Sequence, residues 1–158
     1  MKQSDAKLCV KTLISGLLIL QATACSSMPW HQESAKNIAP TGPTVLNAHA
    51  DPGTFELNNQ LQPIQNNQVL ADVKDFNSKV VEVKLNFTQI PLSVPMKNIG
   101  GTTWAAQLSP DQLKSLAVSG KTMKYEGTVV AKDEAGKSAT SKGTVAIWVD
   151  TPEIKQSG

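Results

Sequence analysis

The chain has 158 residues, close to the usual size of one domain, and its formal net charge is +2. All 15 basic residues are lysine, so the chain lacks arginine, the side chain best suited to bidentate binding of phosphate. Three of these lysines and one of the 13 acidic residues precede Cys25, which leaves 12 of each sign in the rest of the chain. This balance argues against nucleic acid as a partner.

The first 24 residues have the pattern of an export signal. Lys2, Lys7 and Lys11 are followed by an apolar run, TLISGLLILQATA, over residues 12–24. The run is shorter than the ~20 apolar residues that a membrane-spanning helix needs. It therefore predicts a secretory signal over residues 1–24 and not a membrane span.

Two processing reactions remain open at the end of this signal. Ala22, Thr23 and Ala24 form the small-x-small site of ordinary secretion. Together with Cys25 they also resemble the bacterial lipobox, although Ala22 stands where that motif usually has leucine. Because Cys9 and Cys25 are the only cysteines, the predicted folded domain has no thiol for a disulfide, a zinc site or nucleophilic catalysis. We predict a lipoprotein acylated at Cys25, with simple secretion as the alternative.

Ser26 and the residues after it complete the predicted targeting signal. In a Gram-negative cell, Ser26 resembles the sorting signal for the outer membrane, so we expect a cell-envelope protein held to the membrane by its acyl chains. The alternative is a soluble periplasmic or secreted protein. Residues 25–43 are rich in polar residues and proline and predict a flexible tether, in which Trp30 and His31 are interpreted as incidental.

From residue 44 onward, apolar and polar residues alternate, which is typical of half-buried β-strands. The predicted strands cover residues 44–49, 69–73, 81–87, 104–108, 123–131 and 144–149. The last two flank the turn-forming sequence DEAGK and are expected to form a hairpin. We place the domain at residues 44–152 and a tail at residues 153–158.

One segment departs from this alternation. The sequence SPDQ at residues 109–112 combines a hydroxyl N-cap, a proline at the first helical position and a capping box. Leu113 and Leu116 then give an apolar helix face, and Gly120 is a suitable terminator. The sequence thus predicts an all-β sandwich of two layers with one short crossover helix over about residues 110–118.

Residues 63–149 resemble the bacterial immunoglobulin-like domains of extracellular and envelope proteins. The matching segments are VLADVKD, SKVVEVKLNF, GGTTW, YEGTVVAKDEAGKSATS and GTVAIWVDTP, in this order. Lys137 stands where such domains more often have asparagine. The resemblance implies an immunoglobulin-like β-sandwich in which Trp104 fills the core and Tyr125 bonds to the main chain as in a tyrosine corner.

Residues for catalysis are few. His49 and Asp51 lie near one another at the end of a predicted strand, but no motif places a nucleophilic serine beside them. Asp72 and Asp75 flank a strand end, where solvated carboxylates are the ordinary interpretation. We therefore expect that the protein is not an enzyme.

Three acidic residues are candidate ligands of a calcium ion. Asp133 and Glu134 lie in the predicted hairpin turn and Asp150 ends its return strand, and hard oxygen ligands of this kind suit Ca²⁺. A turn-forming, solvated Asp133 is the favoured interpretation, so no cofactor is expected.

Trp148 is the candidate residue for binding a partner. If Val145, Ile147 and Val149 face the core, Trp148 faces outward on what could be an edge strand. The opposite phase, with Trp148 buried and the valines outward, is the alternative. The first hypothesis is a non-catalytic, lipid-anchored interaction module, an accessory or structural subunit whose partner is an envelope or surface protein. The alternatives are an assembly factor that captures a client by edge-strand addition near residues 140–149, and a Ca²⁺-dependent binder of glycans or a host surface.

Overall fold

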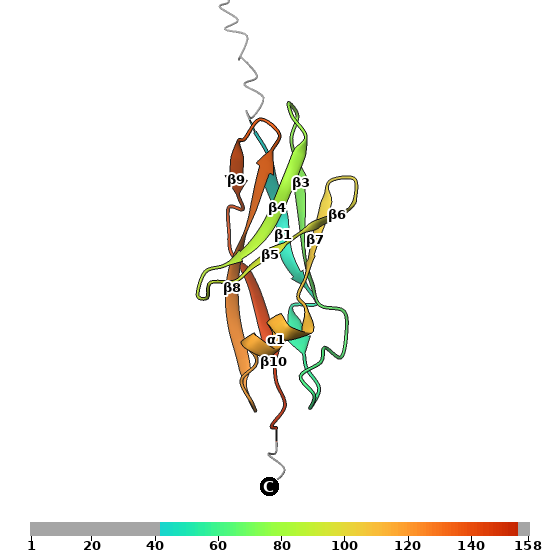
Figure 1. The fold of residues 1–158 in the computed structure, drawn as a ribbon, viewed down its shortest axis with the longest axis vertical. Coiled ribbons are helices and arrows are strands. Elements are labelled where there is room, and N and C mark those ends of the chain that lie inside the picture. The colour runs from blue at the N-terminus through green and yellow to red at the C-terminus, as the bar shows by residue number, and fades with distance from the viewer. Residues whose placement is uncertain (1–41, 155–158) are drawn as a thin grey trace, which may run out of the picture. The chain divides into compact units, whose positions relative to one another are not determined.

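The described part of the computed structural model, residues 42–154, forms ten strands and one α-helix (Figure 1). In chain order these are β1 (Thr44–Asp51), β2 (Thr54–Glu56), β3 (Gln68–Lys74), β4 (Val80–Phe87), β5 (Ser93–Pro95), β6 (Lys97–Gly100), β7 (Thr103–Gln107), α1 (Pro110–Leu116), β8 (Thr122–Asp133), β9 (Ser138–Thr140) and β10 (Val145–Asp150). Within this range no helix is both long and apolar enough to cross a membrane.

The strands form two sheets whose inner faces share one apolar core. One sheet has the order β1-β3-β7-β6 and the other β2-β10-β8-β4-β5, with β9 also paired to β8. Alternate residues of the central strands point inward, among them Val69 and Ala71 of β3, Leu85 of β4, and Val129 and Ala131 of β8, all buried. The predicted all-β sandwich with one short helix is confirmed.

At both sides of the sandwich, the chain passes from one sheet to the other between consecutive strands. After β1, which pairs with β3, the chain turns over residues 51–53, and β2 pairs in parallel with β10. On the other side, β5 pairs with β4, the N–H of Met96 donates to the carbonyl oxygen of Val83, and β6 then pairs with β7. At each side, the chain therefore passes from one layer to the other between two consecutive strands.

The predicted hairpin exists, but its return strand is broken. β9 pairs with the end of β8 and β10 with its beginning. At the break, the N–H of Ser141 donates to the carbonyl oxygen of Val129 at 2.8 Å. The Ser141 hydroxyl accepts from the N–H of Val129 at 3.2 Å and donates to the carbonyl oxygen of Gly143 at 2.7 Å. One serine thus keeps β8 hydrogen-bonded where its partner strand is interrupted.

One position of β4 differs from the alternation. The sequence predicts Val81 on the inner face together with Val83 and Leu85, yet its side chain is 51% exposed. The pairing of β4 with β8 shifts register between Val80 and Glu82, which is the signature of a β-bulge. The extra residue turns Val81 outward, while Val83 and Leu85 stay in the core.

The helix α1 forms as predicted at its start. The N–H of Gln112 donates to the Ser109 hydroxyl and the N–H of Ser109 donates to the Gln112 side-chain oxygen, which completes the capping box. The helix ends at Leu116, two residues earlier than predicted, because Ala117 has extended dihedral angles. The Tyr125 hydroxyl donates to the carbonyl oxygen of Leu116 at 2.7 Å, so the predicted bond from Tyr125 to the main chain is confirmed.

Candidate functional site

The predicted processing and sorting residues lie outside the described residues. These are Ala22, Thr23, Ala24, Cys25 and Ser26, and the tether residues Trp30 and His31 lie outside them as well. The predictions about acylation and address therefore stay predictions. The candidates that the structure describes are Trp148, the acidic residues near the ends of β8, and two hollows in the surface.

Trp148 lies on the outer face of its sheet. Val145, Ile147 and Val149 are buried, while Trp148 is 41% exposed, so of the two phases that the alternation leaves open, the structure has the one with Trp148 outward. On the neighbouring strand its partner is Lys124, whose Nζ lies 5.9 Å from the centroid of the indole ring, within the range of a cation–π contact. The same Nζ lies 2.7 Å from Oε1 of Glu126.

The strand that carries Trp148 is not an edge strand. β10 pairs with β8 on one side and with β2 on the other, where Trp148 is opposite Thr54 and donates its N–H to the carbonyl oxygen of Gly53 at 3.1 Å. The prediction of a possible edge position is therefore wrong for Trp148. The three residues of β2, Thr-Phe-Glu, are too few to give a readable alternation in the sequence. Trp148 projects instead from the strand next to the short edge strand β2, at a position where its main chain is paired on both sides.

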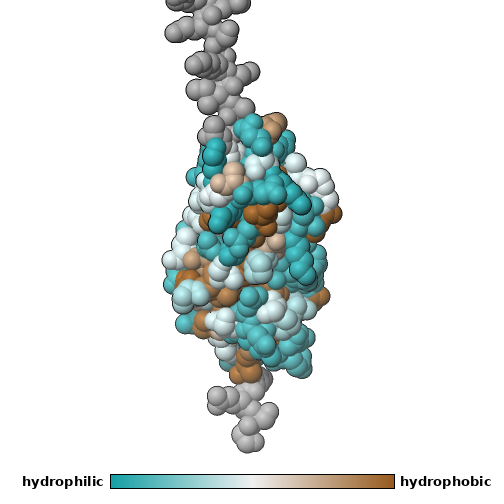
Figure 2. Space-filling model, turned by 45° about the horizontal axis from the view of Figure 1, so that its top comes forward, coloured by the Kyte–Doolittle hydropathy of each residue, from teal (hydrophilic) through white to brown (hydrophobic). Residues whose placement is uncertain are grey.

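Large apolar side chains are otherwise sparse on the surface. Figure 2 shows one face of the domain, on which hydrophilic residues predominate and hydrophobic ones emerge in small separate groups. Besides Trp148, the most exposed apolar side chains in the described residues include Phe76, Ile99 and Ile64, which belong to different loops and strands. Scattered apolar residues of this kind are ordinary for a folded domain.

The structure separates the three candidate calcium ligands. Asp133 is the last residue of β8, whereas Asp150 pairs with Thr122, the first. Twelve residues of extended chain place the two carboxylates about 36 Å apart. Glu134 lies beside Asp133 and cannot bridge this distance, and nowhere in residues 42–154 do three potential metal-binding side chains gather. The three acids therefore do not form one metal site.

Both aspartates have local structural partners instead. Asp133 is buried, and its Oδ1 accepts the N–H of Lys137 at 2.7 Å across the turn that the sequence predicts. The Asp150 carboxylate accepts a hydrogen bond from the Thr122 hydroxyl on the adjacent strand. Asp133 was expected to be a solvated turn residue; it is a turn residue, but its side chain is inside the protein.

The other acid and histidine candidates also bond locally. Asp72 accepts from the side-chain amide of Asn47 and from the hydroxyl of Thr103, both at 3.0 Å. These two donors, the Asn47 amide first, lower the pKa of the Asp72 carboxyl. His49 is exposed, and its ring Nδ1 donates to the carbonyl oxygen of Asn47 at 2.7 Å. Within the described residues, no hydrogen bond joins His49 to Asp51.

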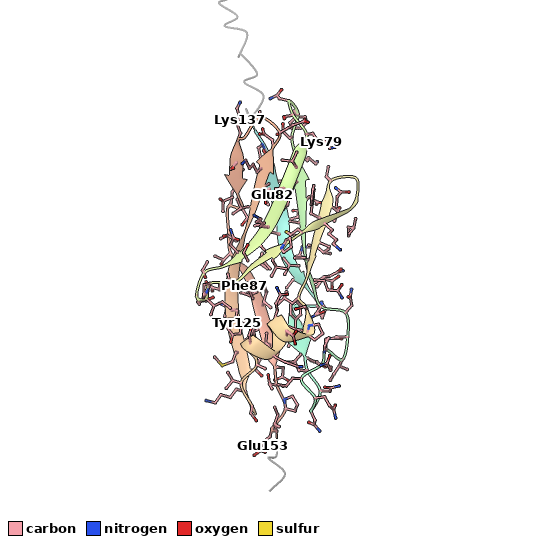
Figure 3. All side chains as sticks on the ribbon, in the orientation of Figure 1. Lys79, Glu82, Phe87, Tyr125, Lys137 and Glu153 are labelled. Atoms are coloured by element: carbon pink, nitrogen blue, oxygen red, sulfur yellow. The ribbon has the colours of Figure 1, made fainter. Side chains whose placement is uncertain are left out.

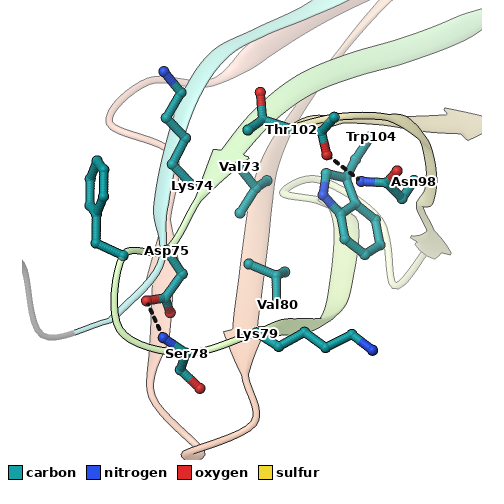
Figure 4. Close-up of a pocket in the computed structure, with 11 residues that line it drawn as sticks. Val73, Lys74, Asp75, Ser78, Lys79, Val80, Asn98, Thr102 and Trp104 are labelled. Carbon is teal, nitrogen blue, oxygen red and sulfur yellow. Dashed lines mark hydrogen bonds between the residues drawn. The ribbon is translucent and has the colours of Figure 1, made fainter.

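Trp104 lines the first hollow, which has a volume of about 640 Å³ (Figure 4). Its side chain points between the sheets and packs against the core, as expected, but is only half-buried. Val73 and Val80 face the indole across the hollow, and Lys79 and Asn98 lie at its rim. Trp104 is therefore a wall residue at a point where the two sheets diverge and not a fully enclosed core residue.

Asn67 lines the second hollow, a groove of about 680 Å³ beside the ends of β5 and β7. Its side chain is 2% exposed, yet its Nδ2 has no hydrogen-bond partner in the described protein. The sequence analysis did not identify this site, because Asn67 lies in the polar stretch QPIQNNQ, which is typical of an ordinary loop. Burial of one amide among several similar ones depends on tertiary contacts that no local pattern encodes.

Comparison with protein-family models finds no match, and comparison with curated proteins finds no significant relative.

Proposed function

We propose that the protein is a non-catalytic, lipid-anchored interaction module of a bacterial cell envelope, and that it binds a partner protein through the sheet face around Trp148. The observation that carries this proposal is the exposure of a tryptophan at a position where its strand is paired on both sides. Aromatic side chains that are rigidly held and half exposed are typical anchors of protein interfaces.

The surroundings of Trp148 suit a specific interface. Lys124 and Glu126 form an ion pair next to the indole, and Thr54 lies on the other flanking strand. This arrangement puts an apolar centre between polar groups, as in the interfaces of protein complexes. Since Trp148 is fixed by main-chain pairing on both sides, a partner would order few additional groups on binding.

The cellular location in this proposal comes from the sequence. Cys25 and the small residues before it support acylation, and Ser26 supports the outer membrane as the destination in a Gram-negative cell. The two alternatives have less support. β2 already pairs with residues 148–150, which shortens the edge open to a client strand, and the candidate calcium ligands are far apart.

Cross-linking in living cells tests the partner. The native chain, Trp148→Ala and the matched control Phe76→Ala are recovered by an affinity tag; Phe76 is 72% exposed and lies in the loop between β3 and β4. We expect one dominant envelope protein with the native chain and with Phe76→Ala, and its loss with Trp148→Ala. Equal recovery from all three chains would refute the Trp148 face as the interface.

A separate test addresses the anchor. Cys25→Ser should abolish incorporation of labelled fatty acid and release the protein from the membrane fraction. If Cys25→Ser still incorporates fatty acid and still sediments with membranes, the lipoprotein assignment is wrong, whatever the outcome at Trp148.

A further inference from the structure

The described chain begins at one end of the sandwich, called the turn end below. This end consists of the β3–β4 loop and the β8–β9 turn, and it is opposite the helix end, where α1 lies (Figure 1). Thr44 of β1 pairs with Lys74, the last residue of β3. Gly42 lies so close to Lys137 that a Cβ at Gly42 would be 3.2 Å from the Cβ of Lys137. The chain therefore enters the domain at the turn end.

This point of entry determines which part of the domain lies nearest to an anchor. Cys25, the predicted site of acylation, precedes Gly42 by 17 residues. A chain of this length spans at most about 60 Å, and as a random coil about 20–25 Å. The twelve residues of β8 separate the turn end from the helix end by about 36 Å. An anchor at Cys25 thus keeps the turn end near the bilayer, and the helix end could reach it only with the intervening chain stretched along the domain.

The turn end carries the most exposed large apolar side chain in residues 42–154. Phe76, in the β3–β4 loop, is 72% exposed. Val81, which the bulge of β4 turns outward, is 51% exposed and follows Val80, whose partner Asp133 ends β8. An exposed phenylalanine beside basic residues is typical of protein segments that lie in the boundary between lipid headgroups and acyl chains.

The lysines of the turn end are all exposed. They are Lys74 at the end of β3, Lys79 just before β4, and Lys137 in the β8–β9 turn. The N–H of Glu134 donates to the carbonyl oxygen of Lys79, which joins the turn to the loop. Figure 3 shows Lys79 and Lys137 at the same extremity of the domain, and in Figure 4 the side chains of Lys74 and Lys79 extend away from the loop. Lysines in such positions are attracted by anionic headgroups within about a Debye length.

The acids of the turn end are less exposed than its lysines. Asp133 is 2% exposed, and Oδ1 of Asp75 accepts the N–H groups of Asn77 and Ser78, the second of which Figure 4 shows. Glu134 is the one exposed acid of the loop and the turn. An approaching surface therefore meets three ammonium groups and one carboxylate at this end.

We propose that the turn end docks on the headgroup layer of an anionic phospholipid bilayer, with Phe76 at the acyl boundary and the three lysines at the phosphates. This inference rests on the part of the proposed function that places an acyl anchor at Cys25. Since the anchor confines the domain to the bilayer, contacts too weak to hold a free protein are sufficient. Trp148, opposite Lys124 near the start of β8, then lies toward the helix end and away from the lipid, where a partner protein can reach it.

Site-specific attachment to lipid nanodiscs tests the proposal. In the chain from residue 25 onward Cys25 is the single cysteine, so its thiol is coupled to a maleimide lipid in place of the acyl group. The nanodiscs contain phosphatidylcholine, phosphatidylglycerol and a gadolinium-chelating lipid. Paramagnetic relaxation of the ¹⁵N-labelled amides of Asn77 and Gly136 measures contact at the turn end, and that of Ser115 measures contact at the helix end. We expect strong relaxation at the turn end only.

The lipid composition and two variants separate docking from attachment alone. On phosphatidylcholine nanodiscs, and in Lys79→Glu or Phe76→Ser, the relaxation of the two turn-end amides should fall by at least about twofold, because attraction or insertion is weakened. Both substitutions are at exposed positions, and unchanged amide shifts elsewhere check that the fold is intact.

Matched controls lie at the helix end. Lys121→Glu changes an exposed lysine just before β8. Ile64→Ser changes a side chain that is 62% exposed, and the N–H of Ile64 donates to Glu56, whose partner Asp150 is opposite the first residue of β8. Both controls should leave the relaxation of the turn-end amides unchanged.

Equal relaxation on the two kinds of nanodisc, or in the native chain and both variants, would overturn the proposal and leave the turn end open to another partner. Stronger relaxation of Ser115 than of Asn77 would overturn it as well, because the helix end would then face the bilayer. Since coupling replaces acylation, this test and the Cys25→Ser test in cells can fail independently. Docking does not involve Trp148, so Phe76→Ala remains a valid control for the Trp148 face.

Discussion

The two ends of the sandwich are closed by different interactions. At the helix end, α1 inserts Leu113 and Leu116 into the core, and Tyr125 lies over it with its ring edge-on to Phe87 at 6.4 Å. At the turn end, which contains the β3–β4 loop and the β8–β9 turn, carboxylates of Asp75 and Asp133 accept main-chain N–H groups.

Figure 3 shows Lys79 and Lys137 at the turn end, Tyr125 and Phe87 near the helix, and Glu153 beyond it. One fold therefore uses apolar packing at one end and carboxylate caps at the other. The first should respond most to changes of side-chain volume, and the second to removal of its carboxylates.

The largest expected effect is at the helix end. Leu116→Ala removes a fully buried side chain and leaves a cavity between α1 and the sheets, so the free energy of unfolding should fall by about 2–5 kcal/mol. Urea denaturation measures this change. The adjacent exposed variant Lys114→Ala is the control and should change stability by less than about 0.5 kcal/mol. A loss below about 1 kcal/mol for Leu116→Ala would show that α1 contributes little to the core.

Asp133→Ala tests the turn end. Without the carboxylate, the N–H of Lys137 loses its buried acceptor, and the free energy of unfolding should fall by about 1–3 kcal/mol. Thermal unfolding of Asp133→Ala, Asp133→Asn and Glu134→Ala provides the measurement. Asparagine retains an acceptor and should lose less, and the exposed Glu134 should be nearly neutral. Equal stability of the Asp133 and Glu134 variants would contradict a structural role for the buried carboxylate.

Tyr125→Phe separates the hydrogen bond from the packing at the helix end. The ring still contacts Phe87, while the carbonyl oxygen of Leu116 loses its donor, so the expected loss is about 0.5–1.5 kcal/mol. Chemical denaturation together with hydrogen exchange of the α1 amides checks it. We expect faster hydrogen exchange in α1 only. A uniform increase of exchange across the domain would argue against a local role of the Tyr125 hydrogen bond.

The smallest effect concerns acid sensitivity at Asp72. Hydrogen bonds from Asn47 and then Thr103 lower the pKa of this carboxyl in the folded state below its ordinary value of 3.8. The resulting stabilisation is complete above the unfolded pKa and is lost as the pH falls below about 4 through the folded pKa. Asp72→Asn should therefore flatten the pH dependence of unfolding below about pH 4, and Asn47→Ala should flatten it partly. Unchanged slopes in both variants would exclude this contribution.

Local patterns were sufficient for part of the fold. Alternation over β8 and the SPDQ capping box each depend on residues close in sequence, and both predictions are confirmed. The bond from Tyr125 to the main chain is also confirmed, but it was expected from the resemblance and not from a local pattern. The bulge at Val81 and the pairing of β2 with Trp148 were not predicted, because both depend on the register of a strand far away in the chain.

The same limit applies to the sites. Two-residue periodicity places Trp148 opposite Val145, Ile147 and Val149, but it does not determine which face is outward or that β2 flanks Trp148. Asn67 resembles Asn66 in sequence, yet Asn67 is buried and Asn66 is exposed, because burial depends on tertiary contacts.

At both sides of the sandwich the chain passes from one sheet to the other, and this affects the tendency of the domain to aggregate at high concentration. Free sheet edges template association between molecules, and long straight ones do so most readily. Here β5 and β6 are three and four residues long and are separated by a change of sheet, β5 ends in Pro95, and β1 carries an irregularity between Leu46 and His49. The described domain therefore offers no long uninterrupted backbone edge to a second copy, and we expect it to resist aggregation even when many molecules are crowded together.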